Sequence, residues 1–306
     1  MFFSFLANFS LSSPSSPPPS RNSRSSAADT RPTMRFEQQL ATARQLVPAA
    51  GAADREMARV LERADVPALE HVTRLHATLA ELIGAPSLSR LHRDIPGFTV
   101  RAENGAHAEM KHQKQQMLAS LADERRAAPF LAAYDALIRD VVAPNIGADS
   151  LHYSAFPTVR VQQPSAYAGI RPHCDAMYDL PAGSVNWWVA LTHPLRPCRT
   201  LHVESAPGAG DFAPLLPPEG ALVRFDGRRC LHFTQPNLST RTRVSLDFRA
   251  VPSRYVDPAS RLARAGYWSV AARDDASGAY QKARAGRVSL YHGFPFTAKP
   301  EYDLVA

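Results

Sequence analysis

The sequence is poor in cysteine and lacks long apolar runs, and each shortage excludes a class of protein. Its 306 residues contain three cysteines, Cys174, Cys198 and Cys230, an odd number without close paired spacing. This pattern argues against a disulfide framework or a zinc knuckle and suits a reducing compartment. The longest apolar run is far shorter than the roughly 20 residues that a bilayer span requires, so we expect no transmembrane helix.

Blocks of like charge are also missing. The formal charge of +7 comes from 35 basic and 28 acidic side chains, and only four of the basic residues are lysine. Scattered arginines of this kind give little support to a nucleic-acid-binding or membrane-binding surface. With 45% hydrophobic and 21% charged residues, the composition is that of an ordinary globular chain. We therefore expect no nucleic-acid partner, no membrane association and no obligatory protein partner.

Residues 1–33 differ in composition from the rest of the chain. They contain ten serines, five prolines and three arginines, with no acidic residue before Asp29. Such a segment cannot bury enough apolar surface to fold alone. Its Ser-rich, acid-poor composition is typical of an organellar transit peptide. Two interpretations stay open: a transit peptide for a plastid or mitochondrion, or a disordered tail on a cytoplasmic protein whose functional start is Met34 rather than Met1.

Hydrophobic periodicity divides the remaining chain into a helical part and a strand-rich part. Residues 34–149 carry apolar residues at helical spacing, and Gly84 with Pro86 ends one of these helices. We interpret residues 103–112 as a loop. The short β-prone runs that follow, separated by Pro, Gly and Asn, are residues 158–163, 171–178, 185–191, 200–205, 221–225, 230–234 and 242–251.

Seven or eight short strands at this spacing predict a β-sandwich or jelly roll. We therefore expect a mainly β fold with flanking helices and a helical N-terminal region. In this organisation residues 34–149 support the fold and residues 150–251 form its catalytic β core. Residues 252–306, with a short helix at 260–265, pack on that core as an extension.

His173 and Asp175 are the first candidate site residues. If residues 171–178 form a strand, both side chains point to one face, because strand side chains alternate with a period of two. His232 lies in another β-prone run. Two imidazoles and one carboxylate suit a non-haem Fe(II) centre and leave coordination positions open for substrate. Taken alone, the H-x-D spacing also arises by chance on an exposed strand.

The segment 242–249 offers a partner for such a centre. Alternation places Arg243 and Ser245 on one face, while Val244, Leu246 and Phe248 point to the other. An arginine inside a barrel requires an anion, and a guanidinium beside a hydroxyl suits a carboxylate. The pattern predicts an anchor for a keto-acid cosubstrate that chelates the iron through its other end. Arg241 is the rival anchor, but it lacks a hydroxyl partner two residues further on.

Together these motifs resemble the Fe(II)/2-oxoglutarate-dependent oxygenases, in particular the streptomycin-biosynthesis-type and phytanoyl-hydroxylase-like members. The resemblance runs from about Phe156 to Arg249. It rests on His173-x-Asp175, residues 186–192 (NWWVALT), residues 203–208 (VESAPG), His232 with Asn237, and residues 243–249 (RVSLDFR). In one respect this chain departs from the pattern: related sequences tend to carry Ser-Asn before Leu201, where it has Cys198-Arg199.

The resemblance implies a double-stranded β-helix, which is a jelly roll of the cupin-like type. It implies that His173, Asp175 and His232 bind Fe(II), and that Arg243 with Ser245 holds the distal carboxylate of 2-oxoglutarate. It also implies that O2 is consumed, that succinate and CO2 are released, and that a small organic substrate is hydroxylated.

Three further residues are weaker candidates, each with a plain alternative. Asn186 either touches the cosubstrate or makes a cross-strand hydrogen bond. Arg160 either binds an acidic substrate or lies exposed on an edge strand, and Tyr178 either lines the pocket or packs in the core. The alternative functions are a cupin-like metal-dependent lyase or isomerase and a non-catalytic metal-binding jelly roll. The Arg243-x-Ser245 pair discriminates against the lyase, which needs no anchor for a dicarboxylate.

Overall fold

A computed structural model describes residues 36–95, 124–166, 168 and 170–286. The chain divides into two units, Met1–Met34 and Arg35–Ala306, and the described residues all belong to the second. The predicted leader of residues 1–33 and the loop predicted at residues 103–112 lie outside the described residues. In the described ranges, no helix has the length and apolar character needed to cross a membrane.

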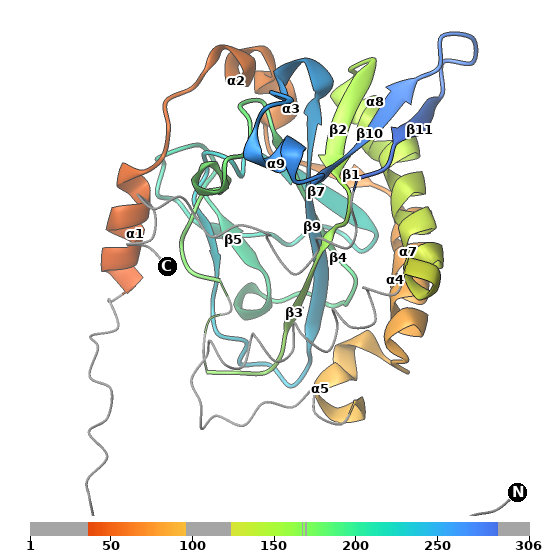
Figure 1. Ribbon diagram of the computed structural model, residues 1–306. Helices are drawn as coiled ribbons and strands as arrows, with labels where there is room; N and C mark the ends of the chain where they lie inside the picture. The colour runs from red at the N-terminus through yellow and green to blue at the C-terminus, as the bar shows by residue number, and fades with distance from the viewer. Residues whose placement is uncertain (1–35, 96–123, 167, 169, 287–306) are drawn as a thin grey trace, which may run out of the picture. The chain divides into compact units, whose positions relative to one another are not determined.

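The strands form two antiparallel sheets. The larger has the order β1-β7-β4-β9-β2-β10-β11, with β3 also paired to β9, and the smaller has the order β6-β5-β8. In Figure 1, β9 lies beside β3 and β4, and it joins the larger sheet together because it pairs with β2, β3 and β4. The strands are β1 (Ala64–Pro67), β2 (Ser150–Ser154), β3 (Thr158–Gln162), β4 (Val185–Ala190), β5 (Leu201–Val203), β6 (Ala213–Pro214), β7 (Ala221–Phe225), β8 (His232–Thr234), β9 (Arg243–Pro252), β10 (Trp268–Arg273) and β11 (Tyr280–Arg284).

Two long helices, α4 (Leu69–Ile83) and α7 (Glu124–Leu137), cover one face of the larger sheet (Figure 1). α4 ends where the sequence predicts, at Gly84, whose φ of 70° is a left-handed conformation that glycine adopts without strain. The other helical segments are α1 (Phe36–Gln45), α2 (Ala52–Glu56), α3 (Ala58–Leu61), η1 (Leu88–Arg90), α5 (Leu91–Asp94), the π-helical η3 (Ile138–Val142), α8 (Ala143–Ile146), η4 (Asp175–Tyr178), η5 (Pro197–Arg199), η6 (Ser253–Tyr255) and α9 (Arg261–Arg264).

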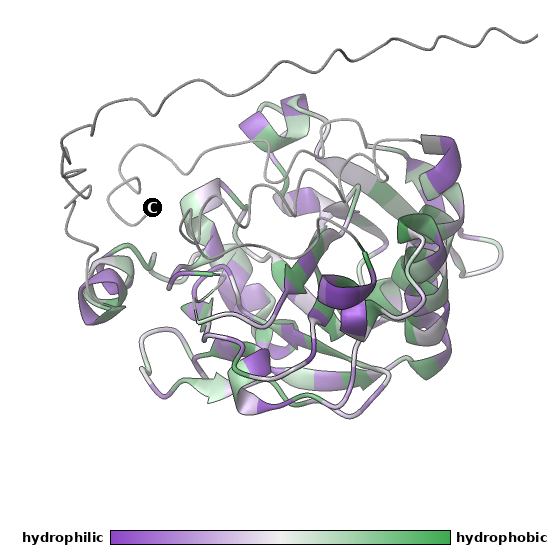
Figure 2. Cartoon of the chain, turned by 90° about the horizontal axis from the view of Figure 1, so that it is seen from below, coloured by the Kyte–Doolittle hydropathy of each residue, from purple (hydrophilic) through white to green (hydrophobic). Residues whose placement is uncertain are grey.

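The main hydrophobic core lies between these helices and the larger sheet. The buried residues of α4 are those at helical spacing, Val72, Leu75, Leu79 and Leu82. β4 and β9 present alternate residues to the same core, where Trp187 and Phe248 stack with ring centroids 6.4 Å apart. Figure 2 shows hydrophilic and hydrophobic residues alternating along the strands and long helices. The intervening residues of β4 and β9 therefore face the smaller sheet, and this inner face carries the polar side chains of the site.

The prediction of a strand at residues 171–178 is wrong. His173 forms only an isolated bridge with His232, and Asp175–Tyr178 is the 3-10 turn η4. The backbone N–H of Asp175 donates to the carbonyl of Gly227, at 2.9 Å, instead of to a neighbouring strand. A contact with a distant loop thus fixes this segment, and local alternation cannot reveal it.

Both ends of the described chain add strands that the sequence did not predict. β1 lies within the part expected to be helical and pairs with β7 at one edge of the larger sheet. β10 and β11 come from the C-terminal extension and lengthen the same sheet at its other edge. The short helix expected at residues 260–265 is present as α9, with Ser260 as its N-cap.

Candidate active site

Three side chains with metal-binding atoms meet between the two sheets. His173 and His232 are held together by their isolated bridge, with N–H to carbonyl distances of 3.2 and 2.9 Å. The Nε2 atom of each ring lies 3.7 Å from Oδ1 of Asp175. All three residues are buried, and their ligand atoms lie within 4.8 Å of one another. His173 and Asp175 therefore converge as the sequence predicts, although a turn and not a strand places Asp175.

Hydrogen bonds to the backbone fix the tautomer of both imidazoles. Nδ1 of His173 lies 2.9 Å from the carbonyl of Arg171, and Nδ1 of His232 lies 3.0 Å from the carbonyl of Cys230. A carbonyl oxygen can only accept, so each Nδ1 carries the hydrogen. Each Nε2 then has a free lone pair facing Asp175, which is the arrangement of a metal-binding histidine with a backbone partner.

One oxygen of Asp175 is saturated with donors while the other has none. Oδ2 accepts hydrogen bonds from Nδ2 of Asn186, at 2.5 Å, and from Nε of Arg249, at 2.8 Å. Nη2 of Arg249 lies 2.6 Å from the same oxygen. Oδ1 is buried and has no hydrogen-bond partner. Asn186 and Arg249 together clamp Asp175 through Oδ2, and Oδ1 is left free to bind a cation between the two imidazoles. Asn186 therefore contacts a candidate metal ligand.

The protonation states suit a cation at this place. Burial, followed by the charge of His232, lowers the pKa of His173 to about 3, and burial likewise lowers the pKa of His232. Burial by itself raises the pKa of Asp175, but Arg249 and the two imidazoles outweigh it and bring that pKa below its usual value. At neutral pH the site therefore offers two neutral imidazoles and one carboxylate.

This donor set fits non-haem Fe(II). Two imidazole nitrogens and one carboxylate oxygen are the ligands of that centre, and the orphaned Oδ1 of Asp175 is the buried acceptor that a bound cation satisfies. In the part of the chain that the structure describes, His173, Asp175 and His232 are the only group of three or more such side chains able to hold a metal ion.

A chain of alternating charges supports Asp175 from the far side. Nη1 of Arg249 lies 2.5 Å from Oδ1 of Asp247, and Oδ2 of Asp247 lies 2.6 Å from Nε of Arg160. Asp247 and Arg249 belong to the motif at residues 243–249, but the sequence alone predicts no role for them. They lie on the same strand face as Arg243 and Ser245, so the alternation that identified those two extends to them. Arg160 is partly buried and ion-paired, and so it is not an exposed edge-strand arginine.

Arg243 is the second notable feature of the site. It is 2% exposed, and its Nη1 donates to Oγ of Ser245 at 2.9 Å. No carboxylate of the described residues lies within ion-pair distance, and Nε has no hydrogen-bond partner. Burial, and then the charge of Arg160, lowers the pKa of Arg243 to about 9. This buried guanidinium beside a hydroxyl is therefore suited to bind an anion such as a carboxylate. Arg241, by contrast, precedes β9 and is exposed.

A small cavity, of about 20 Å3, lies between the two candidate metal-binding imidazoles and the Arg243 guanidinium. Its lining contains both candidate metal-binding imidazoles, the Asn186 amide and the Arg243 guanidinium, together with apolar side chains from both sheets. The remaining lining residues are Arg160, Ile170, Trp187, Trp188, Leu201, Phe225, Asp247 and Arg249. Tyr178 is not among them, and its ring packs edge-on against His173 with centroids 5.8 Å apart.

Gly227 is the residue that leaves room for the clamp on Asp175. A Cβ at this position would lie 2.4 Å from Cγ and Nδ2 of Asn186. We expect Gly227→Ala to displace the amide from Asp175 and to lower the free energy of unfolding by about 1–3 kcal/mol, measured by urea denaturation. In an Asn186→Ala background the same substitution should cost less than about 1 kcal/mol, because the clash is gone. Equal costs in both backgrounds would contradict this account.

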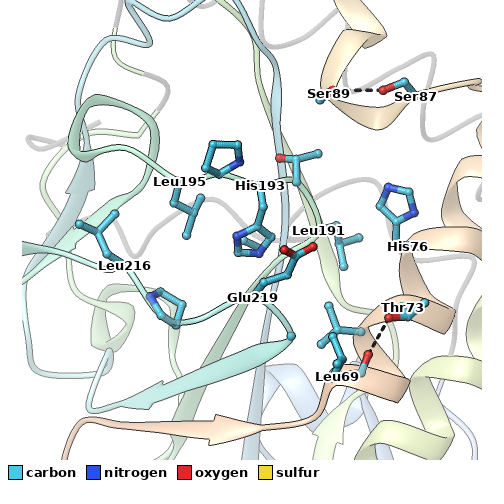
Figure 3. A pocket seen from close by; sticks show the side chains of 16 residues that line it. Leu69, Thr73, His76, Ser87, Ser89, Leu191, His193, Leu195, Leu216 and Glu219 are labelled. Atoms are coloured by element: carbon cyan, nitrogen blue, oxygen red, sulfur yellow. Dashed lines mark hydrogen bonds between the residues drawn. The ribbon is translucent and has the colours of Figure 1, made fainter.

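A larger cavity, of about 760 Å3, lies away from this site, between α4 and the loops that follow β4 and precede β7. Figure 3 shows His76, His193 and Glu219 among its lining residues, surrounded by leucines. Burial lowers the pKa of His76, and the nearby charge of Glu219 opposes this only in part. None of the three candidate metal ligands lines this cavity, so we do not assign it as the active site although it is the larger of the two.

The comparison with known proteins gives a distant curated relative. No family model matches the chain. The chain is similar to the streptomycin biosynthesis protein StrG of Streptomyces griseus, with 28% identity over 113 residues. The match covers 37% of this chain and 53% of StrG, so the chain spans about half the length of the curated relative that it matches.

Similar solved structures include two non-haem enzymes, SnoN and ThoJ, and the protein AviO1. The α-ketoglutarate-dependent epimerase SnoN from nogalamycin biosynthesis has 17% identity and a TM-score of 0.38, covering 77% of this chain and 94% of its own. AviO1 from Streptomyces viridochromogenes has 17% identity and a TM-score of 0.44, covering 67% and 96%. The non-haem monooxygenase ThoJ, as a nickel complex, has 19% identity and a TM-score of 0.37, covering 65% and 77%. At such scores the likeness by itself establishes neither the fold nor the activity of this chain.

Proposed function

We propose that this protein is an Fe(II)- and 2-oxoglutarate-dependent oxygenase that hydroxylates a small organic substrate and releases succinate and CO2. The observation that carries the proposal is one cavity lined by both imidazoles of a buried His-Asp-His cluster and by a buried arginine that has no carboxylate partner. We further propose that the two sheets form a double-stranded β-helix of the cupin-like type. The phytanoyl-hydroxylase-like assignment stays a prediction.

The residues of the chain divide the work. His173, Asp175 and His232 would hold Fe(II), which supplies the redox chemistry for oxidation by O2. Arg243 and Ser245 would bind the distal carboxylate of 2-oxoglutarate and so orient its keto-acid end toward the metal ligands. The apolar lining, including Trp188 and Leu201, excludes water from the reacting atoms.

The substrate side of the cavity is less defined. We propose Arg160 as a substrate contact because it lines the cavity while its Nε is held by Asp247. Tyr178 stays a second predicted contact only through its packing against the His173 ring, since it does not line the cavity itself. A metal-dependent lyase or isomerase would need no buried cation for a second carboxylate, so Arg243 favours the oxygenase over that alternative. A non-catalytic metal-binding jelly roll would not need that cation either.

Anaerobic titration tests the proposal. The unmodified chain, given Fe(II) and 2-oxoglutarate together under argon, should develop a weak visible metal-to-ligand charge-transfer band that neither compound produces alone. His232→Ala should remove the band because one of three ligands is lost. A screen of small metabolites should then identify one that increases succinate release. Absence of the band in the unmodified chain, or its persistence in His232→Ala, would refute the assignment.

A further inference from the structure

Arg199 is a second buried arginine without a carboxylate partner. It ends η5, two residues before Leu201 of the cavity lining, and it is 1% exposed. Its Nη2 donates to the carbonyl of Pro194, whereas Nε and Nη1 have no hydrogen-bond partner. A buried charge in this condition is costly unless an anion neutralises it, so the side chain indicates a ligand that binds there.

The charges around Arg199 have the same sign as its own. Burial, and then the charge of Arg241, lowers the pKa of Arg199, and Arg196 adds to the effect. Arg199 in turn contributes to the lowered pKa of Arg243. Within the described ranges no ion pair joins Arg199 to an acidic side chain. Arg199 is therefore a second buried guanidinium, and it lies near enough to Arg243 to lower the pKa of that residue.

The backbone places Arg199 and Arg243 at the same end of the sheets. The chain leaving β4 is tied to the start of β9, because the Thr192 hydroxyl accepts a hydrogen bond from the N–H of Val244 at 3.0 Å. Two residues later, Pro194 supplies the carbonyl that holds Arg199. Val244 directly follows Arg243, so a short and hydrogen-bonded stretch links the two arginines.

We propose that Arg199 is a second binding residue for the distal carboxylate of a 2-oxo dicarboxylic acid, which would lie between Arg199 and the Arg243–Ser245 pair. This inference rests on the proposed function. One anion then neutralises both buried cations, and the hydrogen-bond donors of Arg199 gain an acceptor. It follows that two guanidiniums of the protein, rather than one, recognise the negatively charged tail by which the chain selects its keto acid.

The test compares two keto acids that differ only in that tail. The full chain, loaded with Fe(II) under argon, is titrated calorimetrically with 2-oxoglutarate and with 2-oxopentanoate, which has a methyl group where 2-oxoglutarate has its distal carboxylate. Arg199→Gln should weaken 2-oxoglutarate binding on the order of 10- to 100-fold, because one charge-assisted hydrogen bond to the ligand is lost. The affinity for 2-oxopentanoate should change less than about threefold, since that ligand has no group for Arg199 to bind.

Matched variants separate this inference from the proposed function. Arg196→Gln removes an exposed charge nearby and should change either affinity less than about threefold. If Arg199→Gln folds poorly, Arg199→Lys keeps the charge and should retain a preference for 2-oxoglutarate between those of Arg199→Gln and the unmodified chain. Equal losses for both keto acids, or none in Arg199→Gln alongside a selective loss in Arg243→Gln, would overturn the role of Arg199 and leave the proposed function intact. No selective loss in either variant would overturn both.

Discussion

Arg249→Met is expected to lower the free energy of unfolding by about 3–5 kcal/mol, the cost of removing one partner from a buried charge network. The side chain of Arg249 is 2% exposed and contacts two carboxylates, those of Asp175 and Asp247. Methionine keeps much of the volume but leaves the Asp175 carboxylate with Asn186 as its remaining donor. Urea denaturation followed by tryptophan fluorescence, with a chelator present, measures the change without any contribution from bound metal.

Arg254→Met is the matched control for this substitution. Arg254 also pairs with a carboxylate, that of Glu56, but both side chains are more than half exposed. A surface pair of this kind contributes only about 0–1 kcal/mol. Similar losses of unfolding free energy in the two variants would show that the buried network around Asp175 stabilises the fold no more than a surface ion pair does. That result would contradict the prediction.

The pH dependence of the same variant gives an independent check. Arg249 helps to hold the pKa of Asp175 below its usual value. Asp175 therefore stabilises the folded state above the unfolded-state pKa of about 3.9, and this contribution is lost as the pH falls. Without Arg249, burial raises the pKa of Asp175, and protonation then relieves the buried charge. We expect the deficit of Arg249→Met to shrink as the pH is lowered from 7 toward 4.

The chemistry of β9 could be predicted from the sequence because it depends on local alternation. Arg243 and Ser245 are buried on the inner face, and Val244, Leu246 and Phe248 pack in the main core, as period two requires. The same rule could have extended to Arg249. What the rule cannot supply is the partner of each side chain, because the pairing of Arg249 with Asp175 joins residues 74 positions apart.

The parts that sequence reasoning missed depend on contacts between distant segments. Asp175 is placed by a turn whose backbone bonds to Gly227, so the H-x-D motif predicted the proximity of His173 and Asp175 from an incorrect secondary structure. The amide of Asn186 donates to Asp175, a partner that local sequence cannot supply. For Arg199 the sequence offers only a departure from related chains. Its burial without a partner becomes visible only when the loop after β4 is in place.

Arg243→Ala is expected to weaken 2-oxoglutarate binding by about one and a half to three and a half decades. Truncating one partner of a buried charge pair costs roughly 2–5 kcal/mol, and each 1.4 kcal/mol is about tenfold in affinity. Iron binding should survive, because Arg243 donates to Ser245 and, within the described part of the chain, makes no hydrogen bond or ion pair with His173, Asp175 or His232. Calorimetric titration with an inert 2-oxoglutarate analogue measures the loss.

Arg241→Ala is the control, since it removes the same charge from an exposed position two residues away, before β9 begins. Exposed charges are screened by salt and have no fixed hydroxyl partner, so its loss should weaken binding by much less than the loss of Arg243. Arg243 differs because it is buried and hydrogen-bonded to Ser245, which fixes the orientation of its guanidinium for binding a carboxylate. An unchanged affinity in Arg243→Ala, or a larger loss in Arg241→Ala, would refute the anchor and remove the main support for an oxygenase.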